Sequence, residues 1–181
     1  MLQLAGGAGL EIAKGCRERI KKTHTGNGGA MSGTYTLTLT GTYPLDQSLV
    51  LLLGQGPDGV YTTGYVRFGF YLSGPQTVSI PYSCNDTNYS HYLLAEAVKL
   101  KNRPQSIEVV AGGSAVVTLS KTLTDYSQAI MIPTAMSAHD GWGGLGIYAK
   151  ITGANQVSFF QGDDTTAATP DSTWRGYVIQ P

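Results

Sequence analysis

Alternation of polar and apolar residues is the clearest pattern along the chain. From residue 34 to residue 43, threonines at every second position alternate with Tyr35, Leu37 and Leu39, which places hydroxyl groups on one side and apolar groups on the other. A repeat of two is the period of an extended strand. The segment 34–43 therefore predicts a half-buried β-strand.

Further apolar runs, bounded by Gly, Pro, Asn, Asp or Ser, predict a series of short strands. They lie at 48–53, 60–72, 76–82, 106–111, 115–120, 126–132, 145–152, 155–160 and 174–180. This spacing favours an all-β protein with a single antiparallel β-sandwich of jelly-roll or immunoglobulin-like type. Residues 91–101 fit a short helix or a strand, and the pattern leaves both open.

The first thirty residues follow a different pattern. Ile12, Cys16 and Ile20 fall four positions apart among charged residues, which is typical of an amphipathic helix. Residues 25–29 are rich in glycine and indicate a flexible linker. We therefore expect a helical or extended N-terminal arm at 1–30, a sandwich domain at 31–181, and a role for the arm in assembly, because so short a helix needs a partner.

An alternative concerns the start of the chain. Met31 follows a Gly-Gly-Ala sequence, and residues 1–30 would not belong to the native product if synthesis began at Met31. The intact mass of the protein from its native source distinguishes the two cases.

Charged residues make up 13% of the chain, against about 25% in ordinary soluble domains. Such a surface suits a secreted protein, and it also suits a subunit packed against its own copies, because few charges are desolvated on assembly. The net charge is zero, so we expect no nucleic-acid partner. The N-terminus has no apolar run after a basic cluster, which predicts no secretory signal, and no apolar stretch is long enough to cross a bilayer, which predicts no membrane insertion.

Candidates for chemistry are few. The three histidines have no second metal-competent residue at metal-ligand spacing, so we expect neither a metal nor another cofactor. No nucleophile motif is present, and we expect no catalytic residue and no enzymatic activity. Cys16 and Cys84 predict no functional disulfide.

The loop 137–144 is the best candidate for binding. Glycines flank Trp142 and cannot cover it, so the indole, with His139 and Asp140 beside it, would form a platform for a sugar ring or an apolar side chain. The alternative is that Trp142 folds back over the end of the sandwich. Trp174 lies within a predicted strand and is expected in the core.

The arm, the Thr/Tyr-alternating first strand, the Gly-rich loops and the closing sequence TPDSTWRGYVIQP together resemble β-rich structural proteins of tailed bacteriophages. These are tail, baseplate, fibre or capsid-decoration subunits. The resemblance implies a non-enzymatic homo-oligomer in the virion, with neighbouring virion proteins and host surface glycans as partners. The alternative is a lectin-like carbohydrate-binding β-sandwich, located outside the cell or at its surface, in which Trp142 stacks on sugars.

Overall fold

The chain folds into β-strands throughout the part that the structure describes. The computed structural model describes residues 10–25, 29–58, 65–86, 90–112, 116–139, 147–161 and 171–181. Within these ranges there are fourteen strands and no helix, and every strand pair is antiparallel. The predicted all-β class is confirmed.

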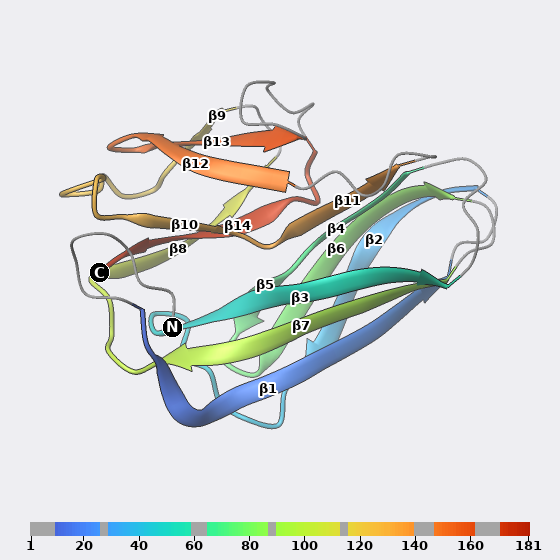
Figure 1. The fold of residues 1–181 in the computed structure, drawn as a ribbon, viewed down its shortest axis with the longest axis horizontal. Helices are drawn as coiled ribbons and strands as arrows, with labels where there is room; N and C mark the ends of the chain where they lie inside the picture. Colours follow the sequence, from blue (N-terminus) through green and yellow to red (C-terminus); the bar gives the residue numbers. More distant parts are fainter. Residues whose placement is uncertain are drawn as a thin grey trace.

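Two sheets form the larger part of the molecule (Figure 1). The β1 sheet has the order β1-β7-β3, with bounds β1 (Ile12–Thr25), β7 (Ser90–Leu100) and β3 (Ser48–Asp58). The β6 sheet has the order β11-β4-β6-β2, and β5 also pairs with β6. Its strands are β2 (Gly29–Thr38), β4 (Tyr65–Gly69), β5 (Tyr71–Gly74), β6 (Thr77–Asp86) and β11 (Ala135–His139).

Two smaller sheets lie at one end of the molecule, at the upper left in Figure 1. The β14 sheet has the order β10-β14-β8, with bounds β10 (Ile130–Pro133), β14 (Arg175–Gln180) and β8 (Ser106–Ala111). The β13 sheet has the order β12-β13-β9, with bounds β12 (Ile147–Gly153), β13 (Gln156–Gln161) and β9 (Val116–Thr118).

The alternation read from the sequence around residue 35 describes β2 well. Tyr35 and Leu37 pack against the larger hydrophobic cluster, and Leu39, just after the strand, is buried in it. The intervening threonines are exposed. This cluster packs the β1 sheet against the β6 sheet, and it also includes Ile130, Tyr177 and Ile179 of the β14 sheet.

Strand β14 contributes to both hydrophobic clusters of the protein. Tyr177 and Ile179 belong to the larger cluster, whereas Val178 belongs to a smaller cluster that also contains Trp174 and Phe159. Both faces of β14 are covered, and its residues from Gly176 to Gln180 are all buried. The predicted core position of Trp174 is confirmed, since its exposed fraction is 0%.

Of the two conformations expected for the N-terminal segment, helical and extended, residues 12–25 adopt the extended one, and the helical alternative is wrong. Residues 12–25 form β1, which pairs with β7 from Ile12 to Thr25, and Ile20 is 4% exposed within the core. The reason lies in the spacing: four is an even number, so positions four apart share a face of a strand as well as a face of a helix. Glu18 also holds β1 to the segment that follows β2, because its carboxylate accepts hydrogen bonds from the backbone amides of Thr40 and Gly41.

The described part of the segment 1–30 lies in the body of the protein and does not project as an arm. Residues 26–28 of the expected linker lie outside the described residues, while β2 already begins at Gly29. The residues 91–101, for which helix and strand were both open, form β7. The single sandwich is not confirmed, because the strands form four sheets around two hydrophobic clusters.

Candidate functional site

Strand β1 departs from the regular ladder near its start. Ile12 pairs with Leu100 and Arg17 with Val98, so that five residue steps on β1 face two on β7. Gly15 lies in this bulge with a φ of 74°, a left-handed conformation that glycine adopts without steric cost. Bulges interrupt pairing and redirect side chains. Next to this bulge lies a pocket of about 380 Å³, lined from β1, β3, β7 and β10.

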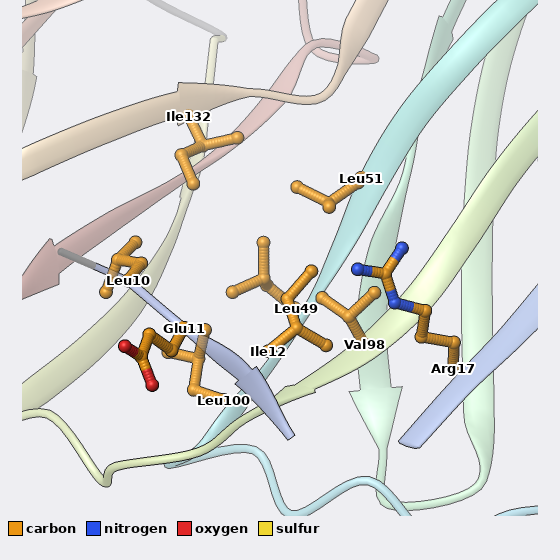
Figure 2. Close-up of a pocket in the computed structure, with 9 residues that line it drawn as sticks. All are labelled: Leu10, Glu11, Ile12, Arg17, Leu49, Leu51, Val98, Leu100 and Ile132. Atoms are coloured by element: carbon orange, nitrogen blue, oxygen red, sulfur yellow. The ribbon is translucent and has the colours of Figure 1, made fainter. Parts of the chain in front are cut away.

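The walls of this pocket are aliphatic (Figure 2). Its leucine, isoleucine and valine residues are Leu10, Ile12, Leu49, Leu51, Val98, Leu100 and Ile132. Leu49, Val98 and Leu100 are at most 2% exposed, so core residues form part of the wall. The two remaining lining residues are Glu11 and Arg17, which Figure 2 shows on opposite sides of the aliphatic group.

Each charged residue of the pocket has an ionic partner. Arg17 Nη1 lies 3.3 Å from Glu96 Oε2, and Lys101 Nζ donates to Glu11 Oε2 at 2.7 Å. The hydrogen bond and the positive charge of Lys101 lower the pKa of the Glu11 carboxyl. Because the Arg17 side chain is 55% exposed and carries five N–H donors, its guanidinium has donors that the single contact with Glu96 does not use.

The pocket opens onto the side of the β1 sheet that faces away from the β6 sheet, which we call the outer face. Arg17, Arg19 and Lys21 are exposed at alternate positions of β1. Antiparallel partners share a face of a sheet, and the partners of Arg19 and Lys21 on β7 are Glu96 and Leu94. The outer face therefore combines a basic row on β1 with apolar residues on the neighbouring strand.

A second hollow, of about 410 Å³, lies farther along the same strand pair. Its lining includes Lys21, Thr23, Tyr92 and Leu94. Tyr92 is 52% exposed and pairs with Thr23. A large aromatic residue that is half exposed beside apolar and basic neighbours is typical of contact surfaces.

The inner face of the β1 sheet carries a buried histidine. His24 is 0% exposed, its Nδ1 lies 2.7 Å from Tyr35 Oη, and its Nε2 lies 3.3 Å from Cys84 Sγ. The Tyr82 ring lies 4.8 Å from the imidazole centroid. Burial is the main cause of the raised pKa of Tyr35. Three strands of two sheets, β1, β2 and β6, thus meet at this imidazole.

A histidine beside a cysteine is the pair that nucleophilic thiol chemistry uses. Here Cys84 is 1% exposed and His24 is 0% exposed, so no substrate reaches the thiol in this conformation, and the contacts are those of a hydrogen-bonded core. Sequence reasoning missed this pair because 60 positions separate the two residues and the fold alone brings them together.

The predicted binding loop is largely beyond what the structure describes. Asp140 and Trp142 lie outside the described residues, and the platform formed by Trp142 is therefore untested. The backbone of His139 ends β11, where it pairs with Tyr65 of β4.

The three residues assigned to an assembly arm are not brought together on one surface. Ile12 lines the pocket at the bulge, and Ile20 lies in the core between the β1 and β6 sheets. Cys16 is half-buried, and neither Cys16 nor Cys84 is in a disulfide. Of these three residues, only Ile12 therefore lines the pocket at the β1 bulge.

Two kinds of feature are absent from the residues that the structure describes. No group of three or more His, Cys, Asp or Glu among them is arranged to hold a metal ion. None of their elements is a helix with the length and apolar character that a membrane span requires.

Comparison with known proteins gives no relative from which a function could be transferred. No family model, no curated protein and no solved structure matches the chain. The similarity in style to tailed-phage proteins therefore remains a resemblance of sequence character. The function has to be argued from the surface of the protein.

Proposed function

We propose that the protein is a non-enzymatic structural component of a virus particle, a tail, fibre, baseplate or capsid-decoration subunit, that assembles as a homo-oligomer through the outer face of the β1 sheet. The observation that carries this proposal is the exposed Tyr92 and the half-buried Leu94 on β7 beside the basic row of β1. Its partners are other copies of itself and neighbouring virion proteins, and its location is the virion.

The low charge of the chain supports assembly. Only 13% of the residues are charged, and desolvating charged groups is what makes a polar surface costly to bury. On β7 the outer face carries one carboxylate, Glu96, and it already contacts Arg17. A partner that covers β7 at Tyr92 and Leu94 therefore buries apolar area beside an ion pair that is already compensated.

The basic residues of the edge strand β1 favour contact between copies through the face of the β1 sheet and not through this edge. Among the described strands, β1 and β3 are the edge strands of this sheet, and an unprotected edge would invite open-ended pairing. Charged residues, lysine above all, discourage such pairing, and β1 carries five basic residues, namely Lys14, Arg17, Arg19, Lys21 and Lys22. A defined oligomer is thus better served by the outer face than by the edge.

We also propose that the two sheet pairs form a single domain. Strand β14 places Tyr177 in the larger cluster and Val178 in the smaller one, so neither cluster is complete without it. A contact with host surface glycans and the lectin-like alternative both rest on the loop around Trp142, and no described residue favours either.

Particles from the native source test the location. After density-gradient purification and a high-salt wash, mass spectrometry should detect the chain in the particle fraction at a fixed ratio to the other particle proteins. If the chain appears only in the soluble fraction, the proposed virion role is wrong.

Two matched tyrosines test the surface. Tyr92 and Tyr126 are both 52% exposed, but Tyr126 lies in the turn after Asp125 and belongs to no strand of the β1 sheet. In sedimentation velocity, Tyr92→Asp should dissociate the oligomer, and Tyr126→Asp should leave it intact. Equal behaviour of the two variants would place the contact elsewhere.

A further inference from the structure

The pocket at the β1 bulge is not needed for contact between flat sheet faces. Its volume of about 380 Å³ falls within the range of about 300–1,000 Å³ that is typical of small-molecule sites. Such sites combine apolar walls with a few placed polar groups. Both features are present here, in the aliphatic walls and in Arg17 and Glu11.

We propose that this pocket binds a single aliphatic chain with an anionic head group, the chain lying among Leu49, Leu51 and Ile132 and the head group at Arg17. The site goes beyond the proposed assembly role, because the pocket lies near the start of β1, whereas Tyr92, which carries the proposed contact, lies near the other end of the β1–β7 pair.

The chemistry of the walls defines the body of the ligand. None of the nine lining residues has a hydroxyl, an amide or an aromatic ring. A sugar or a nucleotide base in this pocket would lose hydrogen bonds to water without replacing them, at a cost of about 1–3 kcal/mol for each unpaired group. A hydrocarbon chain has no such groups and gains from leaving water.

The charges define the end of the ligand. Arg17 stands at one side of the aliphatic group and Glu11 at the other (Figure 2). The Glu11 carboxylate is already held by Lys101 at 2.7 Å. The Arg17 guanidinium lies 3.3 Å from a single oxygen of Glu96, and Arg19 is exposed two residues farther along β1. A carboxylate at Arg17 completes the fork geometry that guanidinium groups favour.

The bulge explains why the space exists. Between Ile12 and Arg17 the ladder to β7 is interrupted, so residues 13–16 do not lie in register against β7. Gly15 permits the detour by its positive φ. The pocket lies beside this detour, and the buried Val98 and Leu49 form part of its wall.

Calorimetric titration of the full chain tests the proposal, with decanoate as the probe at concentrations below its micelle threshold. Saturable binding of one decanoate per chain is expected, with weaker binding of decanol, which has the same chain and no charge. Isotope-labelled methyl groups of Leu49 and Ile132 should shift in NMR spectra during the same titration. No saturable binding, or shifts that leave these methyl groups unchanged, would overturn the proposal.

Variants of the protein distinguish the contribution of the anionic head group to binding from that of the aliphatic chain. Arg17→Gln should weaken decanoate binding about tenfold and leave decanol binding unchanged, whereas the exposed control Lys121→Gln should change neither. Ile132→Trp should fill the pocket and abolish both, and Leu51→Trp is the second filling variant if the first does not fold. Decanoate binding that survives in a folded filling variant contradicts the site.

Vesicles distinguish a free amphiphile from a bilayer. Flotation with phosphatidylglycerol vesicles, without binding of decanoate, would overturn the single-chain ligand in favour of a membrane surface. Because every readout here is ligand binding, failure of this proposal leaves the oligomer test with Tyr92 unaffected.

Discussion

The Nδ1 atom of His24 lies 2.7 Å from the hydroxyl oxygen of Tyr35, and this contact joins the two facing sheets of the larger sheet pair. His24 belongs to β1, and Tyr35 belongs to β2 of the β6 sheet. Because the imidazole is completely buried, the hydroxyl of Tyr35 satisfies a ring nitrogen that water does not reach. The same contact ties the first strand to the rest of the protein.

Tyr35→Phe should lower the free energy of unfolding by about 1–3 kcal/mol, because it leaves a buried ring nitrogen with one partner fewer. Tyr126→Phe, at an exposed position, should change it by less than about 0.5 kcal/mol. Urea unfolding followed by circular dichroism measures both. Similar values for the two variants would mean that the contact with His24 contributes nothing.

Deletion of residues 1–25 should abolish cooperative folding. It removes β1, the buried Ile20 and His24, and the partner strand of β7 over its whole length. A shorter deletion of residues 1–9 is the control and should retain a sharp thermal transition. The expectation of an arm predicted the opposite, a folded body after removal of residues 1–30, and a cooperative transition in the 1–25 deletion would restore that view.

Alkaline pH should destabilise the protein through its buried tyrosines. Burial raises the pKa of Tyr177 well above its ordinary value, and the pKa values of Tyr35 and Tyr43 are raised for the same reason. The fold favours the neutral phenols, so their contribution is complete below the unfolded pKa of about 10 and is lost as the pH rises toward the folded values.

The free energy of unfolding should therefore decline above about pH 10. Tyr177→Phe should make that decline shallower by about 1.4 kcal/mol per pH unit. At pH 8 the variant should be less stable than the parent, because the Tyr177 hydroxyl accepts the backbone N–H of Leu72 at 2.8 Å. If the free energy of unfolding declined with pH equally steeply in the variant and the parent, the pKa of Tyr177 would be the same in the folded and unfolded states.

Gly69→Ala should destabilise the protein by about 3 kcal/mol. A Cβ at Gly69 would lie 2.0 Å from the backbone oxygen of Thr173, and backbone atoms cannot rotate away. Gly153→Ala is the matched strand control, because its Cβ would meet only ordinary contacts at 3.8 Å. Chemical denaturation measures the free energy of unfolding of both variants. Equal values would show that the segment before β14 shifts to make room for the added methyl group.

The parts of the fold that follow a local pattern could be predicted from the sequence. The threonines around Tyr35 and Leu37 alternate because one face of β2 is in water, and the apolar run ending at Ile179 reflects a strand covered on both faces. The spacing of Ile12, Cys16 and Ile20 failed as a guide because it fits both periods.

The candidate site could not be predicted, because it depends on contacts between distant parts of the chain. The pocket joins Leu10 to Ile132 and depends on a bulge whose only local sign is Gly15. The exposed side of Tyr92 depends equally on the register of β7 with β1, which a single strand pattern does not determine.

The absolute molar mass of the purified chain, measured by light scattering over a hundredfold range of concentration, tests the central claim most directly. One chain has a mass of 19.2 kDa. Assembly through the outer face predicts a fixed integer multiple of that mass that persists on dilution. A mass of one chain at every concentration would contradict a homo-oligomeric structural subunit.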